Sequence, residues 1–525
     1  MLDEVLLLLI YTLSLFHTLR SHIGMGVPNL WELLLPAEKK ISLEGLVDRH
    51  GRCHQRGLRM AIDVALWIFQ AKRASNDDQS YDMNVMFYRF CRIYHLGIRP
   101  VFVFDGEGRP NMKRKQFVNT RIPDTIAMRK LKSLIKLFGF AEWLAYGEAE
   151  AECAVLQRLG YVDLVMTGDV DVFLFGARRV LRHWPSKDGF PCGCYDTSWF
   201  NLDRSDLILI AILRGSDYQD GIKGIGIKLA EGLARAKHHT LLMQAMQNDK
   251  TLSFDDPRVN ALFESLACEI RTNKSGHLSR TYKNIDLSPS PEHFWILKEF
   301  INPTTRIENK DFVVQAHKLK EFLDRDQAPS PDFGSLGPYC RENFEWSQKV
   351  VLTRFKAKLY PAYILHKVRL KAWKAVTPSR SFKKKHPLRT QQTTVDTFYR
   401  STKDYRNAEN DQAIIARIWQ HKIVMDRKFY RVQWHDTALD QFLAPIRTKL
   451  KAVENFYLQN DFGTNAFHPN ENEDDFSPAC RQWVESSILS TAYPDIVEAY
   501  EIKSQSKPTK KIASQDVYII DDDPF

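Results

Sequence analysis

The stretch Val101-Phe102-Val103-Phe104-Asp105-Gly106 is a short apolar run that ends in an acid. Two further segments, Leu58–Asp63 and Val162–Asp169, also pass from aliphatic residues into aspartate. Apolar runs of this length predict buried strands, and helical patterns lie between them. From Met25 to about Asp220 we therefore expect an α/β fold with a mainly parallel sheet flanked by helices. In such sheets the chemistry lies at the carboxyl ends of the strands.

Seven acids stand at these strand ends or on the segments between them: Asp63, Asp105, Glu148, Glu150, Asp169, Asp171 and Asp217. Each one alone is most simply a helix cap or a turn former. If parallel strands bring them together, their like charges repel, and some would have to stay protonated at neutral pH. Divalent cations remove that repulsion. Oxygen ligands without a nearby Cys or His pattern favour Mg²⁺ or Mn²⁺ over Zn²⁺.

The motifs that carry these acids resemble, in order, those of the flap-endonuclease/XPG superfamily of nucleases. The matching stretches are Met25–Trp31, Ala61-Ile62-Asp63, Phe104-Asp105-Gly106, Glu148-Ala149-Glu150-Ala151, Asp169-Val170-Asp171 and Gly215-Ser216-Asp217-Tyr218. The resemblance covers about Met25 to Leu233 and implies an XPG/PIN-like nuclease core. It implies two Mg²⁺ ions, for which Mn²⁺ can substitute, one held by Asp63, Asp105, Glu148 and Glu150, the other by Glu150, Asp169, Asp171 and Asp217. Glu152 has no counterpart in the pattern, and we expect it on the helix surface.

Basic residues follow the second acid at Arg109, Lys113 and Arg114. A solvated helix face is one explanation. The resemblance implies another, in which Lys113 contacts and polarises the scissile phosphate. It also implies that Gly26, at the start of the core, lies close to the DNA.

The segment from Gly221 to Ala230 is a glycine-rich turn that opens a helix, and its candidate DNA contacts are Gly221, Lys223, Gly224, Gly226 and Lys228. Glycines let backbone amides approach phosphates, and a helix N-terminus favours anions. An ordinary tight turn is the alternative. The segment resembles the superfamily's helix–two-turn–helix, which grips the duplex backbone, often with a K⁺ ion. Contacts of that kind read the shape of DNA rather than its sequence.

Only about forty residues separate Asp105 from Glu148. Flap endonucleases carry a longer insertion there that threads a free 5′ end, whereas the short spacing resembles the GEN-type Holliday-junction resolvases of fungal kind. Asp332–Leu336 and Cys340–Trp346 resemble the segment that closes the core of those resolvases. Tyr430-Arg431-Val432-Gln433-Trp434 and the helix near Tyr493–Ile502 resemble parts of their chromodomain, and a small β-domain of another kind is the alternative. The segment Leu439–Pro478 departs from a minimal chromodomain.

The resemblance implies a structure-specific DNA endonuclease that resolves Holliday junctions near the branch point and leaves 5′-phosphate and 3′-hydroxyl ends. Two alternatives stay open, a 5′-flap or gap endonuclease of the same family and a catalytically inactive junction-binding scaffold. Because a four-way junction has two-fold symmetry, we expect a dimer on the junction and a monomer in free solution.

The expected organisation is an extension of doubtful status at 1–24, a nuclease core at 25–375, a linker at 376–411, a chromodomain-like region at 412–502 and a disordered tail at 503–525. The core divides into an N-region at 25–125, an I-region at 130–215 and a helix–two-turn–helix at 215–246. In the linker, Gln392, Val395, Phe398 and Tyr399 resemble a PCNA-interacting motif, and Val517–Asp523 in the tail resembles a SUMO-interacting segment. Chance matches to such short patterns are the alternative in both cases.

The composition fits a nucleic-acid partner, and Lys507–Lys511 resembles a small nuclear-import patch, so we expect the protein in the nucleus. The 525 residues carry a formal net charge of +10, which favours a polyanionic partner. The apolar run from Val5 to Phe16 is too short for a confident membrane span, so we expect no membrane partner. The eight cysteines show no zinc-type spacing, and we expect free thiols.

Overall fold

The computed structural model describes residues 26–73, 83–109, 112–113, 116–117, 125–185, 191–306, 311–325, 330–376, 415–424, 427–459 and 481–505. The predicted extension, Arg114, the PCNA-like residues Gln392, Val395, Phe398 and Tyr399, and the SUMO-like segment lie outside the described residues. Among the described helices, none combines the length and the hydropathy needed to cross a bilayer.

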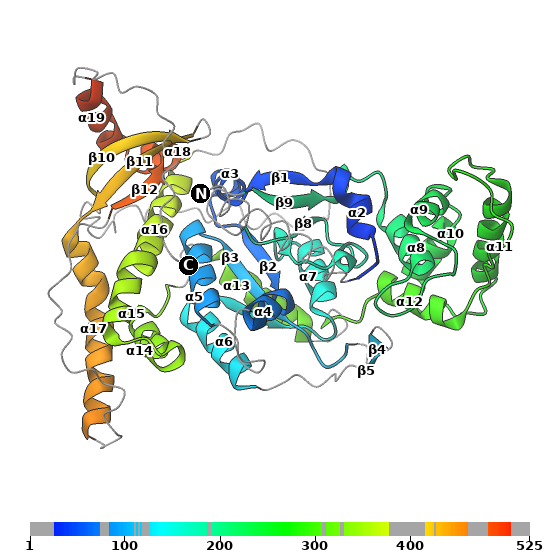
Figure 1. Ribbon diagram of the computed structural model, residues 1–525, viewed down its shortest axis with the longest axis horizontal. Helices are drawn as coiled ribbons and strands as arrows, with labels where there is room; N and C mark the ends of the chain where they lie inside the picture. The colour runs from blue at the N-terminus through cyan, green and yellow to red at the C-terminus, as the bar shows by residue number, and fades with distance from the viewer. Residues whose placement is uncertain are drawn as a thin grey trace, which may run out of the picture.

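A seven-stranded mixed sheet forms the centre of the molecule, in the order β1-β9-β8-β7-β2-β3-β6 (Figure 1). Its strands are β1 (Lys39–Ser42), β2 (Arg59–Asp63), β3 (Arg99–Phe104), β6 (Ala141–Leu144), β7 (Leu164–Met166), β8 (Arg179–Leu181) and β9 (Pro191–Asp196). Strands β8, β7, β2, β3 and β6 run parallel to one another. Strand β9 pairs antiparallel with β8 and with β1. The predicted, mainly parallel sheet is therefore confirmed.

Both faces of the two central strands are covered, because every residue of β2 and β3 is buried. Ala61 packs in the core on one face, and Met60 and Ile62 pack in the core on the other. The first face is covered by α7 (Ala149–Arg158), which contacts β2, β3 and β7. The second is covered by α4 (Val64–Arg73), α5 (Met83–Leu96) and α6 (Ile126–Leu137), with α3 (Leu43–His54) and α16 (Tyr360–Ala375) packed beside them.

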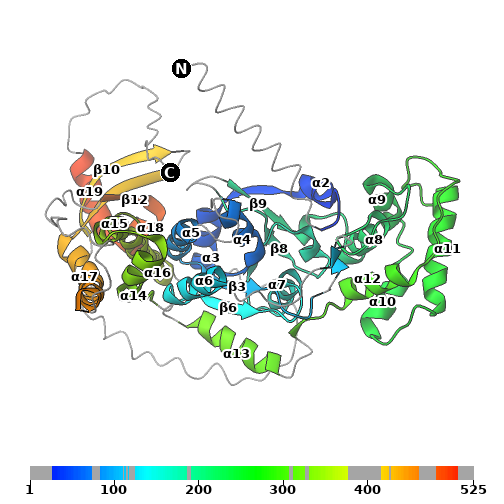
Figure 2. The ribbon, with the colours of Figure 1, turned by 60° about the horizontal axis from the view of Figure 1, so that its bottom comes forward.

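A lobe of helices lies at one end of the molecule (Figures 1 and 2). It consists of α8 (Arg204–Arg214), α9 (Ile227–Arg235), α10 (Thr240–Asn248), α11 (Pro257–Thr272) and α12 (Pro291–Ile301). Its apolar residues share one core with α7 and with one face of the sheet. The lobe is therefore fixed against the sheet. A hairpin of two short strands, β4 (Met112–Lys113) and β5 (Gln116–Phe117), lies at the end of the sheet that faces this lobe.

The opposite end carries a small antiparallel sheet of β10 (Ile415–Val424), β11 (Arg427–Trp434) and β12 (Arg481–Glu485), as Figure 1 shows. The chain reaches it through α13 (Asp311–Asp324), α14 (Phe333–Phe344), α15 (Gln348–Arg354) and α16. After β11 comes α17 (Asp436–Gln459), which packs along α14, and α18 (Ser486–Ala492) and α19 (Pro494–Gln505) follow β12. Helix α19 covers most of the helix expected near Tyr493–Ile502.

Helix α16 connects this end to the elements around the seven-stranded sheet through one large side chain. Trp373 is buried against Gly51 of α3 and Gly97. A Cβ atom would lie 2.2 Å from the indole at Gly51 and 2.8 Å from it at Gly97. Glycine at these two positions is what lets the helix dock, because any larger residue would push the indole away.

Candidate functional site

Three of the predicted acids lie at the ends of neighbouring parallel strands. Asp63 is the last residue of β2, Asp105 directly follows β3, and Asp169 comes three residues after β7. Strand β2 pairs with β3 on one side and with β7 on the other. Because all three strands are parallel, these carboxylates come to the same edge of the sheet, as the sequence predicted.

Asp63 is the most deeply buried of the three, with 1 % of its surface exposed. Burial, with the negative charge of Asp105 next in weight, raises the pKa of Asp63 to about 7. The backbone N–H of Ala65 and the hydroxyl of Thr167 each donate to its carboxylate at 2.9 Å, which only partly offsets that rise. Ionising a buried acid beside a second acid is costly, and a divalent cation would lower that cost.

Two more acids begin helix α7. Glu148 occupies its N-cap position and Glu150 its first turn, where the helix dipole favours negative charge. The hydroxyl of Tyr218 donates to Glu148 Oε2. Burial raises the pKa of Tyr218 well above its ordinary value, and the charges of Glu148, Asp171 and Glu150 add to the effect. Tyr218 is thus surrounded by three of the seven acids.

The start of helix α7 is tied to the end of β3 by Asp105. Its Oδ1 accepts the backbone N–H of Ala149 at 2.9 Å, and its Oδ2 lies 3.2 Å from Nη1 of Arg109. Arg109 therefore contacts one of the acids, outside any helix, and does not stand on the solvated helix face considered from the sequence. Lys113 lies in the short strand β4.

Asp169 and Asp171 lie against the first described residues, Gly26 and Val27. The backbone N–H of Asp171 donates to Asp169, and the N–H of Val27 donates to Asp171 Oδ1 at 3.0 Å. Gly26 has a φ of +78°, and a Cβ atom there would lie 2.4 Å from Asp171 Oδ1 and 2.5 Å from Asp169 Oδ1. The structure therefore places Gly26 directly against the acid group, where only glycine fits.

Asp217 is also buried, with 5 % of its surface exposed, in the turn after α8 that a bridge between Gly215 and Asp220 closes. It lies one residue before Tyr218, whose hydroxyl contacts Glu148. The residues that sequence reasoning did not single out are Tyr218 and Thr167, which hold Glu148 and Asp63 in place. The sequence offered one signal for these two residues, namely that each lies next to one of the acid motifs.

The expectation for Glu152 is wrong. It is 0 % exposed, and its carboxylate accepts the indole N–H of Trp143 at 3.2 Å and the backbone N–H groups of Tyr146 and Arg306. Burial raises its pKa, against the effect of these hydrogen bonds. The partner Arg306 is 154 residues away in sequence, so no local pattern could show that this face of α7 is covered.

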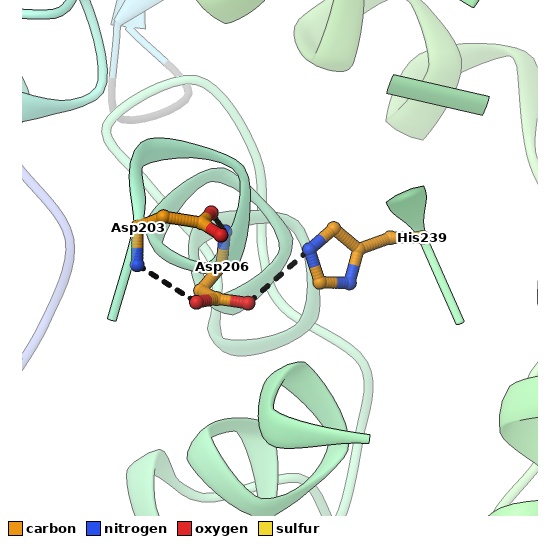
Figure 3. Close-up of side chains that lie close together, drawn as sticks. All are labelled: Asp203, Asp206 and His239. Carbon is orange, nitrogen blue, oxygen red and sulfur yellow. Dashed lines mark hydrogen bonds and ion pairs between the residues drawn. The ribbon is translucent and has the colours of Figure 1, made fainter. Parts of the chain in front are cut away.

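A second group of possible ligand atoms, drawn in Figure 3, lies in the lobe and is formed by Asp203, Asp206 and His239. Asp203 and Asp206 cap the start of α8 reciprocally. The ammonium of Lys237 already bonds both carboxylates. His239 Nε2 lies 3.3 Å from Asp206. Because the Lys237 ammonium already bonds both carboxylates, we interpret this group as a structural link between α8 and the α9–α10 turn.

The predicted glycine turn lies between α8 and α9. Gly224 has a φ of +91°, and Gly226 is the N-cap of α9, with nothing within 4 Å of a Cβ built there. Lys223 is exposed, and the side chain of Lys228 is 81 % exposed and 3.3 Å from Glu231. Gly221 packs tightly against the backbone of Arg214. The turn thus presents an open helix N-terminus flanked by lysines, a surface that suits phosphate groups.

Residues 25–121 match the XPG N-terminal domain, and residues 139–217 match the XPG I-region. Together with the parallel sheet and its acids, these two matches support a nuclease core of the flap-endonuclease/XPG kind.

Within this superfamily the chain is similar to the GEN type. It is 27 % identical to flap endonuclease GEN homolog 1 of Homo sapiens over 274 residues, which are 47 % of this chain and 29 % of that protein. It is 30 % identical to flap endonuclease GEN-like 1 of Arabidopsis thaliana over 254 residues, 43 % of this chain and 41 % of that one. The chain thus matches well under half the length of these relatives.

A solved structure of the Holliday junction-resolving enzyme GEN1 with product DNA and Mg²⁺ has a similar fold. Its TM-score to this chain is 0.62 at 25 % identity, over 90 % of this chain and 98 % of that one. A second solved structure, of a eukaryotic junction-resolving enzyme with cesium, gives a TM-score of 0.64 at 25 % identity over 91 % of this chain and 100 % of that one.

Proposed function

We propose that this protein is a structure-specific, Mg²⁺-dependent DNA endonuclease that resolves Holliday junctions near the branch point. One observation carries the proposal: acids from separate parts of the chain meet at one edge of the parallel sheet, where Asp63 is buried beside Asp105. The glycine turn of the helical lobe adds a surface suited to the DNA backbone. The products would carry 5′-phosphate and 3′-hydroxyl ends.

The acid group suits two Mg²⁺ ions, with Mn²⁺ able to substitute, because its donors are carboxylate oxygens and because burial and the charge of Asp105 make ionised Asp63 costly. We propose that Asp63, Asp105, Glu148 and Glu150 hold one ion and that Glu150, Asp169, Asp171 and Asp217 hold the other. Two ions so held would supply an activated water and charge stabilisation for the leaving oxygen. The chain's own part is orientation: Tyr218 fixes Glu148, and Thr167 fixes Asp63.

The DNA itself would be held mainly through its phosphates. We propose that Gly221, Lys223, Gly224, Gly226 and Lys228 contact the backbone of one arm, with a K⁺ ion in the same turn. Lys113 would polarise the scissile phosphate. Gly26, Arg109 and Arg114 would lie beside it. Because such contacts do not depend on the base sequence, cleavage should depend on the shape of the DNA.

Further partners belong to the same proposal. The small C-terminal sheet with α18 and α19 would be a chromodomain-like unit. Two copies would assemble on one junction, while the free protein would be a monomer. The motif at Gln392–Tyr399 would bind PCNA and that at Val517–Asp523 would bind SUMO. All of this would take place in the nucleus.

Cleavage of end-labelled branched DNAs in Mg²⁺ tests the activity. We expect paired, symmetric cuts in an intact four-way junction, and faster cutting of a 5′ flap than of the junction would favour the flap-endonuclease alternative. Asp63→Asn and the double variant Glu148→Ala/Glu150→Ala should lose cleavage and still bind the junction. Binding without cleavage by the unaltered protein would favour the inactive scaffold, and full cleavage by the acid variants would defeat the site assignment.

A further inference from the structure

An exposed tryptophan stands beside the acid group. Trp295 lies on α12 and has 46 % of its surface exposed, although tryptophan is highly buried on average. With Glu299, one helical turn later, it lines a cavity that also contains Glu148 and Tyr218. Among the described residues, no aromatic ring or cation packs against its indole. The outer face of the indole is therefore available at the mouth of the acid site.

Helix α12 is held in a fixed position relative to the acids. The ring of Phe300 packs edge-on against Tyr218, with 5.8 Å between ring centroids, and Tyr218 donates to Glu148. After the helix, the N–H of Arg306 donates to buried Glu152 at 3.2 Å. These contacts connect α12 and the segment after it to Tyr218 and α7, so the helix that carries Trp295 is held near Glu148.

The size and the charge of the cavity indicate what this surface accepts. The cavity is about 20 Å³, room for roughly one water, so a larger group can lie only at its mouth. Its charged lining residues are Glu148 and Glu299, and neither lysine nor arginine lines it. The lining therefore offers no cationic side chain of its own to a phosphate. An uncharged, planar nucleobase needs none, and tryptophan is a strong stacking partner for any base.

We propose that Trp295 stacks on an unpaired base at the DNA branch point, next to the phosphodiester at the acid group. This inference rests on the proposed function, since the acid group defines where the scissile phosphate lies. A continuous duplex keeps its bases stacked on one another, whereas a branch point can release one. Trp295 is then a specificity-determining residue that favours branched DNA over continuous duplex.

Fluorescence of 2-aminopurine tests the contact. The base analogue is placed on either side of the cleaved phosphate of a four-way junction and bound by the full chain carrying Asp63→Asn, which prevents cutting. We expect the complex with Trp295 to quench the analogue and the Trp295→Ala complex to be brighter, at saturation confirmed by anisotropy. Quenching that is equal with and without Trp295 at both positions overturns the proposal.

Cleavage by proteins with Asp63 intact gives a second readout. Base–aromatic stacking is worth on the order of 1–3 kcal/mol, so Trp295→Ala should lower kcat/KM on the junction roughly 5- to 150-fold. Trp295→Phe should retain most of the activity and the quenching. Val313→Ala, at a solvent-facing position of α13 with 56 % exposure, should change neither. An unchanged kcat/KM for Trp295→Ala contradicts the role.

Two outcomes of these experiments call for a further comparison. If Trp295→Ala lowers the melting temperature, Trp295→Leu decides the matter, because leucine keeps apolar volume but has no aromatic face. We expect the Trp295→Leu complex to lose the quenching that the Trp295→Phe complex keeps. Equal quenching by these two variants overturns the proposal. If the unaltered protein cuts no branched DNA, the proposed function fails, while the fluorescence of bound DNA still reports on Trp295.

Discussion

Replacing Asp63 by asparagine should stabilise the protein at pH 8 when divalent ions are removed. Burial, followed by the charge of Asp105, raises the pKa of this carboxyl from 3.8 to about 7. A difference of about three pKa units corresponds to about 4 kcal/mol. Ionising Asp63 in the folded protein therefore costs about that much more than ionising it in the unfolded chain.

The sign of the pH dependence follows from this difference. Because the folded pKa lies above the unfolded value, the stabilising contribution of Asp63 is complete below pH about 4. It is lost as the pH rises through about 7. Asparagine does not ionise and avoids that loss. It can keep one of the two hydrogen bonds from Ala65 and Thr167, and losing the other costs about 1 kcal/mol. The expected net gain at pH 8 is about 3 kcal/mol.

Thermal melting of both proteins in a chelator, at pH 5 and at pH 8, measures this effect. The advantage of Asp63→Asn should be small at pH 5 and should grow by pH 8. Added Mg²⁺ should then raise the melting temperature of the unaltered protein more than that of the variant, because a ligand that binds only the folded state stabilises it. An asparagine variant that melts at or below the unaltered protein at pH 8 would refute the reasoning.

Asp163 provides the matched control. Burial would raise the pKa of this carboxyl, but hydrogen bonds and charge from Arg56 and Arg59 outweigh burial and hold it well below its usual range. Its contribution to stability is therefore present above its unfolded pKa and is lost as the pH falls. Asp163→Asn should lower the melting temperature at pH 8, opposite to Asp63→Asn. If both substitutions moved the melting temperature in the same direction, charge coupling would not explain either result.

Three further predictions concern the acid site and the turn. Gly26→Ala places a methyl group against two acids and should shift cleavage to higher Mg²⁺ concentrations; an unchanged Mg²⁺ titration would contradict the packing. Glu152→Ala leaves buried donors unpaired and should cost about 1–3 kcal/mol in urea denaturation, whereas Glu152→Gln should cost less. Equal losses would show that the hydrogen bonds are unimportant. Lys223→Ala and Lys228→Ala should each weaken junction binding independently of sequence and reduce its salt dependence by about one ion, which titrations at several salt concentrations measure.

Much of the fold could be predicted because buried strands, and the acids that follow them, can be recognised from residues that are neighbours in the sequence. The run predicted at Leu58–Asp63 is β2 from Arg59, and the run at Val101–Asp105 is β3, which ends at Phe104. Buried parallel strands need apolar residues on both faces, so their sequence is continuous and recognisable. The edge strand β1 carried no such signal, because none of its residues is buried, and β9 is buried from Cys192 to Asp196 but contains no aliphatic run.

The sequence by itself determined which residues could do chemistry: acids where strands end and glycines where the backbone must turn. The tertiary structure decided which of them act together. Burial and charge coupling depend on distance in space, so the raised pKa of Asp63 needs β3 beside β2. The burial of Glu152 likewise needs Arg306, from far along the chain. The position of Trp295 at the mouth of the acid site depends on how α12 packs against Tyr218, a contact that no local pattern encodes.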